Sequence, residues 1–530
     1  MPTAVTHTAE LVEFAASRWG DRTFIREEDY SLSFTQLLEH VRWAAAGLLE
    51  HGFPHGTRVA IWAPNRWEWI VTALATHYIG GTLVTLNTRY RGHEAAQVLR
   101  LSGAEVLITV GEFLGTQYPA LLVNEDCGDV SRSIVLDQPG ETGFTALLQS
   151  GKEALADPEG PVSQALLAAR GSVRATDLSD ILFTSGTTGT PKGVMTSHRQ
   201  NLRAFTTFAS LLGLEASDRY LIINPFFHSF GYKAGWLACL LVGAEAHPLP
   251  VLDIDALIST IEARQITCMP GPPTLFHSIL THPNLEPARL ASLNKATTGA
   301  AVIPQQLIED MRGVLGIDTV ITAYGLSETC GLVTMCRRGD DAGTIARTSG
   351  RAIPDVEVSI VNPTGEHLAP GSLGEIVVRG YNLMLGYLDD AEATEQTIDE
   401  DGWLHTGDIG ALDSEGNLCI TDRLKDMYIS GGFNCYPAEI EQLLLRHPDI
   451  SQVAIVGRAD DRLGEVGAAF IVASGPDRAD AEALTAWCRD HMANYKIPRE
   501  IHWIDALPLN ASGKVLKTRL RDMLHAPQSA

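Results

Sequence analysis

Ten residues of this chain read Thr184-Ser185-Gly186-Thr187-Thr188-Gly189-Thr190-Pro191-Lys192-Gly193. Glycines let backbone amides approach a polyphosphate, hydroxyl groups donate to its oxygens, and a lysine supplies positive charge. The stretch therefore predicts a phosphate-binding loop at the end of a buried strand. It is not a Walker A loop, because Pro191 stands where that motif has its second glycine and Gly193 where it has Ser or Thr.

The residues around this loop predict an α/β body with largely parallel strands, because short apolar runs alternate with helical patterns. The runs lie at residues 58–62, 104–110, 133–136, 180–184 and 219–224. Helices are expected at residues 35–49, ending at Gly52, and from about Ser197 to Leu212, ending at Gly213. We expect the second helix to start directly after the phosphate loop, where its N-terminus would face phosphate.

The pattern changes after about residue 370. Strands at 374–378, 410–412 and 417–421, with a hairpin turn at 413–416, predict a β-rich part. The last hundred residues or so return to an α/β pattern, with helices at 439–446 and 479–492 and strands at 452–456 and 467–472. We place a domain boundary at 422–426, so that residues 1–422 form a large N-terminal domain and residues 423–530 a small C-terminal one.

The composition of the chain indicates which classes of protein it can belong to. The chain has 530 residues, 45% of them hydrophobic and 20% charged, and a formal net charge of -24. It is therefore expected to be globular, and its acidity argues against nucleic-acid binding. The eight cysteines lack metal-like spacing, and no segment approaches the ~20 apolar residues that span a bilayer. We expect a cytoplasmic protein with reduced thiols and no stable membrane insertion.

Seven further motifs follow the loop in order. They are Pro225-Phe226-Phe227-His228, Thr298-Gly299-Ala300-Ala301, Tyr324-Gly325-Leu326-Ser327-Glu328-Thr329, residues 402–408 (GWLHTGD), 422–426 (DRLKD), 431–441 (GGFNCYPAEIE) and 508–514 (PLNASGK). The series resembles the adenylate-forming superfamily, which comprises acyl-CoA synthetases, firefly-type luciferases and the adenylation domains of peptide synthetases. By this resemblance the chain is identified as a member of the acyl-CoA synthetase branch.

The resemblance implies a carboxylic acid substrate, with ATP, Mg²⁺ and coenzyme A as cofactors. Tyr324 would stack on adenine, Ser327 would meet the α-phosphate and Glu328 would hold the magnesium ion, and Gly325 of the same motif is also a predicted nucleotide contact. Ser327 stands where threonine is commoner, and it keeps the hydroxyl. The remaining nucleotide contacts implied are Thr184, Ser185, Gly186, Thr187, Thr188, Gly189 and Lys192 for phosphates, Asp408 for both ribose hydroxyls, and Arg423 for ribose or phosphate.

The same resemblance implies that residues 423–530 are a mobile lid. Lys425 would be the hinge, although Asp422 departs from the glycine that the family often has there. Lys514 would reach between the carboxylate and the α-phosphate, whereas Gly431 and Gly432 would line the pantetheine tunnel after the lid rotates. Lys514, Glu328 and His228 are thus the catalytic candidates.

The acid pocket is expected to be lined by residues of the aromatic motif (225–228) and the segment that follows it, of the turn at 298–301, and of the segment 326–334. Its predicted members are Phe227, His228, Phe230, Trp236, Thr298, Gly299, Ala300 and Ala301. No acidic residue follows His228 to hold an amino group, which disfavours an amino-acid substrate. Tyr232 and Lys233 are candidates for polar contacts to an oxygenated acid, a surface position being the alternative for Lys233. Residues 224–235 resemble acyl-CoA ligases of actinobacterial fatty-acid and steroid catabolism, including those that act on ring-bearing propanoates.

The predicted function is ATP-dependent ligation of a fatty or ring-bearing hydrophobic acid to coenzyme A. Two other enzyme classes stay open, an acyl-AMP ligase that loads a carrier protein and a luciferase-type oxygenase. A non-enzymatic nucleotide-binding regulator would be expected to lose Lys514 or Glu328, and both are present. A homodimer also stays open.

Overall fold

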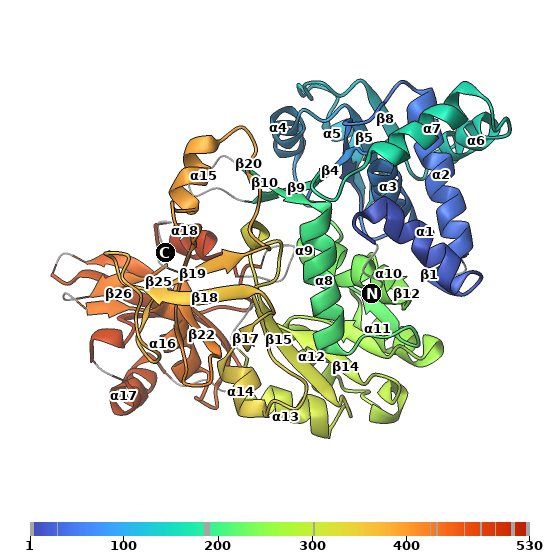
Figure 1. The fold of residues 1–530 in the computed structure, drawn as a ribbon. Helices are drawn as coiled ribbons and strands as arrows, with labels where there is room; N and C mark the ends of the chain where they lie inside the picture. The colour runs from blue at the N-terminus through green and yellow to red at the C-terminus, as the bar shows by residue number, and fades with distance from the viewer. Residues whose placement is uncertain are drawn as a thin grey trace.

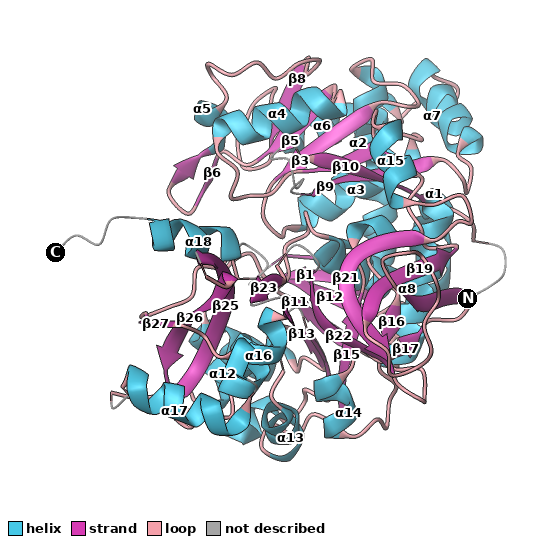
Figure 2. Cartoon of the chain, turned by 90° about the vertical axis from the view of Figure 1, so that its left-hand side faces the viewer, coloured by secondary structure: helices cyan, strands magenta, loops and turns pink. Residues whose placement is uncertain are grey.

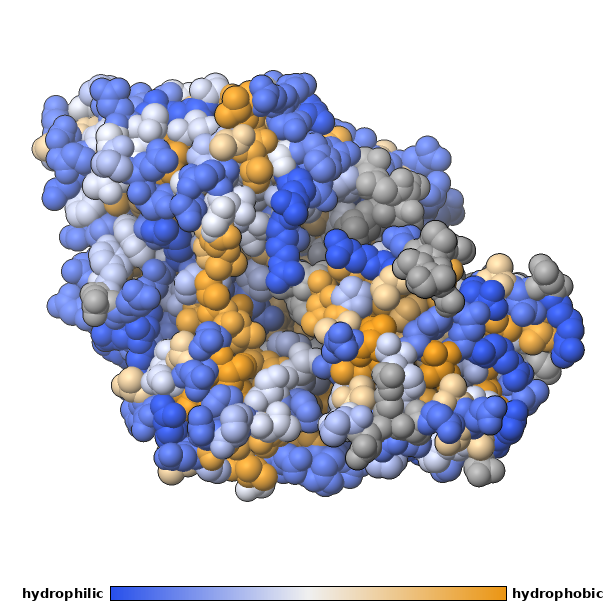
Figure 3. All heavy atoms as spheres, turned by 180° about the vertical axis from the view of Figure 1, so that it is seen from behind, coloured by the Kyte–Doolittle hydropathy of each residue, from blue (hydrophilic) through white to orange (hydrophobic). Residues whose placement is uncertain are grey.

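The computed structural model describes residues 5–28, 30–184, 191–299, 303–423, 426–430, 433–460, 462–476, 480–492, 494–509 and 515–525. Figures 1 and 2 show a large body of sheets and helices, with the C-terminal elements gathered at one side of it. On the face opposite to that of Figure 1, most of the surface is hydrophilic, and apolar side chains gather beside a hollow (Figure 3). The predicted fold class is confirmed.

A seven-stranded sheet carries the phosphate-loop segment, in the order β20-β10-β9-β4-β3-β5-β8. Its five parallel strands are β3 (Arg58–Trp62), β4 (Thr82–Thr85), β5 (Val106–Thr109), β8 (Arg132–Val135) and β9 (Leu178–Thr184). Two antiparallel strands, β10 (Lys192–Ser197) and β20 (Gly386–Tyr387), extend the sheet at the other edge. The predicted strand at residues 58–62 matches β3 residue for residue.

A nine-stranded sheet lies next along the chain, in the order β17-β16-β15-β14-β13-β11-β12-β1-β2. Its central strands are parallel: β11 (Arg219–Ile222), β12 (Glu245–Pro248), β13 (Cys268–Pro270), β14 (Lys295–Thr298) and β15 (Thr319–Tyr324). The edges are β1 (Thr23–Glu27) and β2 (Tyr30–Ser33) on one side, β16 (Thr334–Met335) and β17 (Arg351–Ala352) on the other. Strand ends therefore place several of the predicted motifs along the edges of these two sheets.

Three helices show how the sequence determines where helices of the large body begin, pack and end. Helix α2 (Phe34–Glu50) corresponds to the expected helix at 35–49, and it starts at a capping box made by Ser33 and Gln36. Helix α3 (Trp67–Tyr78) is buried on all sides, which is usual for a helix inside a large core. Helix α8 (His198–Leu212) ends at Gly213 in the left-handed conformation.

One expectation near the phosphate loop was wrong. Helix α8 does not follow the loop directly, because strand β10 stands between them and pairs antiparallel with β9. Val194, Thr196 and Ser197 of β10 are buried, and this short strand satisfies its backbone groups in the sheet. The loop thus connects two arms of a hairpin.

The β-rich part and the C-terminal α/β part follow the predicted pattern. The first is a four-stranded antiparallel sheet of β18 (Val356–Val361), β19 (Gly374–Gly380), β21 (Leu404–Leu412) and β22 (Leu418–Arg423). The second contains β23 (Tyr428–Ser430), β24 (Phe433–Cys435), β25 (Ile450–Asp460), β26 (Gly464–Ala473) and β27 (Glu500–Trp503), with α16 (Pro437–Leu444), α17 (Ala481–His491) and α18 (Lys517–His525). The large hydrophobic core ends at Leu418, and the next cluster begins at Tyr428.

All eight cysteines are free. Among the residues that the structure describes, no helix is long and apolar enough to cross a membrane.

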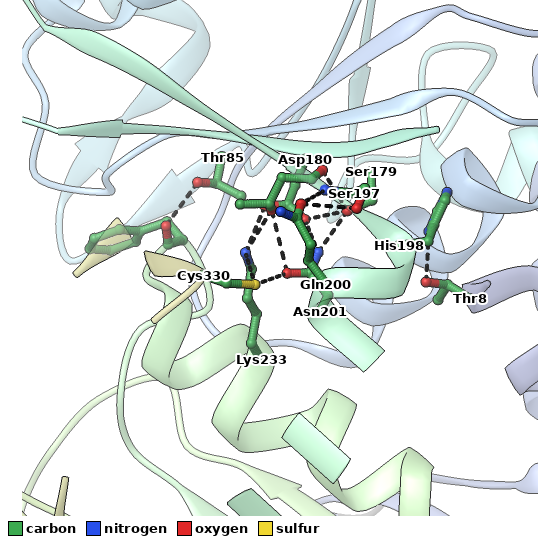
Figure 4. Close-up of polar contacts among 12 residues, drawn as sticks. Thr8, Thr85, Ser179, Asp180, Ser197, His198, Gln200, Asn201, Lys233 and Cys330 are labelled. Carbon is green, nitrogen blue, oxygen red and sulfur yellow. Dashed lines mark hydrogen bonds and ion pairs between the residues drawn. The ribbon is translucent and has the colours of Figure 1, made fainter. Parts of the chain in front are cut away.

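The interior of the large body contains a buried ion pair (Figure 4). The Lys233 Nζ lies 2.9 Å from Asp180 Oδ1, and the two side chains are 1% and 0% exposed. Lys233 also donates to Thr196 Oγ1 at 2.9 Å, and Asp180 Oδ2 accepts from Ser179 Oγ at 2.6 Å and from Asn201 Nδ2 at 2.5 Å. Charges removed from water are tolerated only when paired and hydrogen-bonded in this way. Lys233 is therefore not a surface residue.

We expect each single change, Lys233→Met or Asp180→Asn, to lower the free energy of unfolding of the large body by about 3–5 kcal/mol, because one charge is left buried and unpaired. The double variant should recover most of that loss, since both charges are gone. Denaturant midpoints of the four proteins give the comparison. If the double variant is as unstable as the two single losses added together, the pair is not coupled in this way.

Candidate active site

The phosphate-loop hairpin places two of its predicted contacts opposite each other. Thr184 at the end of β9 and Lys192 at the start of β10 are cross-strand partners, and both are half-buried. The Lys192 amino group lies over the ring of Tyr387, 4.7 Å from its centroid. Ser185, Gly186, Thr187, Thr188 and Gly189 lie outside the described residues, so their phosphate contacts stay predictions.

The aromatic segment that follows β11 is held in place by two polar side chains from the neighbouring sheet. Asn65, which is buried, accepts from the backbone N–H of Phe226 at 2.8 Å and donates to the carbonyl of Asn224 at 2.9 Å. Thr85, at the end of β4, donates to the carbonyl of Phe227 at 2.8 Å (Figure 4). His228 is exposed, and Phe227 is half-buried beside it. The fixed backbone therefore presents these two predicted acid contacts at the surface of the body.

Farther along the segment, the chain turns back into the core. Phe230 is half-buried and meets the edge of Phe208, with ring centroids 6.3 Å apart. Trp236 is fully buried, and its ring stacks on Tyr232 at 4.9 Å. Burial raises the pKa of Tyr232, and the nearby charge of Asp180 adds to the shift. The structure thus places Trp236 in the core and does not bring it to the half-exposed end of the segment.

The predicted adenine and ribose contacts meet across two sheets. The Tyr324 hydroxyl at the end of β15 donates to Asp408 Oδ2 of β21 at 2.6 Å, and Asp408 is buried. Gly325 follows Tyr324, and a Cβ there would lie 2.4 Å from the backbone of Gly331, so only glycine fits. The hydroxyl-bearing Ser327 is half-buried in the same turn. The structure thus brings the predicted adenine contact Tyr324 to the predicted ribose contact Asp408, and their nucleotide contacts stay predictions.

The neighbouring strand β14 ends at the predicted acid turn. Thr298 pairs with Thr322 of β15 in the parallel register, and it is buried. Its Oγ1 has no hydrogen-bond partner among the described residues. Gly299 follows in more open space, and Ala300 and Ala301 lie outside the described part of the chain.

Glu328, the predicted metal ligand, is half-buried and accepts from the Tyr387 hydroxyl through Oε1 at 3.0 Å. Burial raises the pKa of Tyr387, and the Glu328 charge raises it further, so the phenol stays a donor. Within the described ranges, no group of three or more His, Cys, Asp or Glu side chains is arranged to hold a metal ion. One carboxylate fits a magnesium ion that takes most of its ligands from phosphates and water.

The predicted lid residues are mostly outside the described ranges. Lys425, Gly431, Gly432 and Lys514 all fall there, and their roles stay predictions. The backbone of Arg423 is described, and it stands opposite Asp408 in the β21–β22 pair. That register brings the start of the expected hinge next to Asp408, whose contact with ribose stays a prediction.

Sequence reasoning missed three residues of this region: Asn65, Thr85 and Tyr387. Asn65 and Thr85 follow or end parallel strands, and the carboxyl ends of such strands are where ligands bind in open α/β sheets. A search for polar residues at strand ends would have found them. Tyr387 carries no such signal, because its partners are distant in sequence.

Comparison with known proteins connects this geometry to a family. Residues 12–388 match the model of the AMP-binding enzyme family, and residues 439–514 match that of the AMP-binding enzyme C-terminal domain. A 3-[(3aS,4S,7aS)-7a-methyl-1,5-dioxo-octahydro-1H-inden-4-yl]propanoyl:CoA ligase of Rhodococcus jostii is 46% identical over 525 residues, 98% of each chain. A ligase of the same name from Mycobacterium tuberculosis is 46% identical over 504 residues, 95% of this chain and 96% of its own.

Solved structures agree with the family models. The o-succinylbenzoate CoA synthetase of Bacillus subtilis, in complex with its acyl-adenylate intermediate, is similar with a TM-score of 0.80 and 29% identity, covering 97% of this chain and 98% of its own. The predicted resemblance is thereby confirmed. The chain belongs to the AMP-binding enzyme family, in its acyl-CoA ligase branch.

Proposed function

We propose that this protein is an AMP-forming acid–CoA ligase whose acid is a propanoate attached to a fused bicyclic diketone. The observation that carries the proposal is the 46% identity, over 98% of the chain, to a ligase named for such an acid. ATP and coenzyme A are its co-substrates as a member of this branch. The acid then forms an acyl-adenylate with release of pyrophosphate, and coenzyme A replaces AMP.

The first step must bring a carboxylate to the α-phosphate of ATP. Two like charges about 4 Å apart repel by roughly 4 kcal/mol at an effective dielectric of about 20. We assign Lys192 and Lys514 to offset this repulsion with positive charge. Lys192 would lie beside the phosphates, and Lys514 between the carboxylate and the α-phosphate. Glu328 would hold Mg²⁺, which when bound neutralises phosphate charge.

Nucleotide orientation is assigned to the contact between Tyr324 and Asp408. Their hydrogen bond of 2.6 Å joins a ring able to stack on adenine to a carboxylate able to accept from ribose hydroxyls. Orientation of this kind lowers the barrier by fixing the reacting atoms before reaction.

The second step needs a thiol to reach the acyl carbonyl after pyrophosphate leaves. We assign this change of access to rotation of residues 423–530 about Lys425, which withdraws Lys514 and brings Gly431 and Gly432 to pantetheine. The gap between the two hydrophobic clusters, after Leu418 and before Tyr428, supports a boundary at 422–426.

For the acid itself, half-buried Phe227 and Phe230 offer apolar surface to a fused ring. The buried Thr298 hydroxyl lacks a partner among the described residues, and a ring ketone oxygen would supply one. These features favour an oxygenated ring acid over a plain fatty acid.

The proposed function is tested by coenzyme A consumption with ATP and Mg²⁺ across straight-chain fatty acids, aryl acids and ring-bearing propanoates with and without ketones. We expect AMP and acyl-CoA in equal amounts, with the highest kcat/KM for the bicyclic diketone propanoate. AMP, pyrophosphate and thioester are followed separately.

The rival functions predict different products in the same assay. Pyrophosphate release without thioester, for an acid that binds, would point to a carrier-loading ligase. Preference for a straight-chain acid would contradict the assigned acid and leave the ligase intact.

Lys514→Ala should abolish adenylate formation, because the change removes the charge placed at the α-phosphate. It should spare thioester formation from a supplied acyl-adenylate. Pyrophosphate release and acyl-CoA formation are measured separately in the same preparation. Equal loss of both half-reactions would argue against the division of labour between the two domains.

Asn65→Ala should lower kcat/KM for the acid by about 10²-fold, because a small displacement of the aromatic segment misplaces the acid. ATP affinity should change little, since Asn65 contacts the backbone of residues 222–226 and Leu249. Steady-state kinetics with each substrate varied in turn make the comparison. An equal loss for acid and ATP would show a general defect instead.

A further inference from the structure

Residues 384–388, called the bridging segment below, join two parts of the candidate site through the backbone. The backbone N–H groups of Leu385 and Leu388 donate to carbonyl groups of β10, those of Met195 and Gly193, each at 2.8 Å. At its other end, Met384 donates to the backbone carbonyl of Glu328, also at 2.8 Å. The segment therefore fixes the metal-ligand turn relative to the phosphate hairpin.

Tyr387 makes the same connection with its side chain. Its ring lies under the Lys192 amino group at 4.7 Å, and its hydroxyl donates to Glu328 Oε1 at 3.0 Å. The residue is 8% exposed and packs with Val194 and Met384. One side chain thus contacts the cation assigned to the phosphates and the carboxylate assigned to the metal.

The backbone just before Tyr387 needs a glycine at position 386. Gly386 has a φ of 143°, which side-chain-bearing residues rarely adopt. A Cβ there would lie 3.2 Å from Thr394, whose hydroxyl accepts from the Tyr387 backbone N–H at 2.9 Å. Together these features fix the direction of the Tyr387 side chain.

We propose that Tyr387 is a positioning residue for the ATP–metal complex, orienting Glu328 through its hydroxyl and Lys192 through its ring; this inference rests on the proposed function. The hydroxyl takes one oxygen of Glu328 and so directs the other toward a metal ion. The ring face holds the Lys192 amino group by a cation–π contact. Hydrogen-bond partners of metal-ligating side chains change metal affinity by about 10–100-fold when removed.

Two variants separate the two contacts. Tyr387→Phe removes the hydroxyl and keeps the ring, whereas Tyr387→Leu removes both. Tyr381→Phe is the matched control, because Tyr381 lies nearby in the chain and its ring packs on the Arg203 guanidinium at 3.8 Å. Mn²⁺ binding in the presence of ATP is measured by electron paramagnetic resonance, ATP binding in EDTA by calorimetry, and pyrophosphate release against Mg²⁺ concentration.

For Tyr387→Phe we expect weaker Mn²⁺ binding and a higher half-activating Mg²⁺ concentration, each by about 10–100-fold. Pyrophosphate release at saturating Mg²⁺ and ATP binding in EDTA should stay close to those of the unaltered protein. Tyr387→Leu should also weaken ATP binding in EDTA, because Lys192 loses its ring contact. Tyr381→Phe should match the unaltered protein in every assay.

Unchanged Mn²⁺ affinity in Tyr387→Phe would overturn the inference, as would an activity loss that added Mg²⁺ does not restore. Failure of the proposed function has different results in the unaltered protein: pyrophosphate release without thioester or with another acid would contradict the assigned acceptor or acid and leave the Tyr387 test standing, whereas absence of both Mn²⁺ binding with ATP and pyrophosphate release would contradict adenylate formation itself.

Discussion

The charge of Lys233 has no access to water, and Asp180 neutralises it inside the large body. The pair and its hydrogen-bond partners come from β9, β10, α8 and the segment after the aromatic motif. Cys330, just after the Glu328 turn, joins them by donating to Asn201 at 2.7 Å. Burial raises the pKa of that thiol to about 11, so it stays protonated as a donor. One polar centre therefore fixes three motif-bearing segments that are far apart in sequence.

This arrangement places rigid structure beneath the site and polar side chains at its rim. Asp180 lies on the strand that leads to the phosphate loop, and Asn65 and Thr85 hold the aromatic segment from the same sheet. Because ligand contacts must stay within a fraction of an ångström of their working positions, such support is part of the site. The bridging segment, which contains the edge strand β20 of the same sheet, does the same for Lys192 and Glu328.

The sequence predicted local features well because their causes are local. Apolar runs with turn residues located β3, a helical stretch that ends at Gly52 located α2, and the motif order identified the family. Burial of Lys233 was not predictable in this way, because its partner is a single aspartate elsewhere in the chain. Strand β10 was missed for a related reason: six residues acquire strand structure only by pairing with β9 and β20. Tyr387 likewise acquires its contacts only from the fold.

The position of these contacts bears on how one site can serve two reactions. Lys192, Tyr324, Glu328, Tyr387 and Asp408 all precede residue 422, on the side of the large core. The hydrogen bonds from Tyr324 to Asp408 and from Tyr387 to Glu328, and the contact of Lys192 with the Tyr387 ring, all form between residues that precede 422. Under the proposed function, a nucleotide site organised in this way would keep AMP and the acyl group oriented while residues 423–530 change position. Under the proposed function the aromatic segment would hold the acid through both steps, first while its carboxylate attacks the α-phosphate and pyrophosphate leaves, and then while the thiol attacks the acyl carbon and AMP leaves.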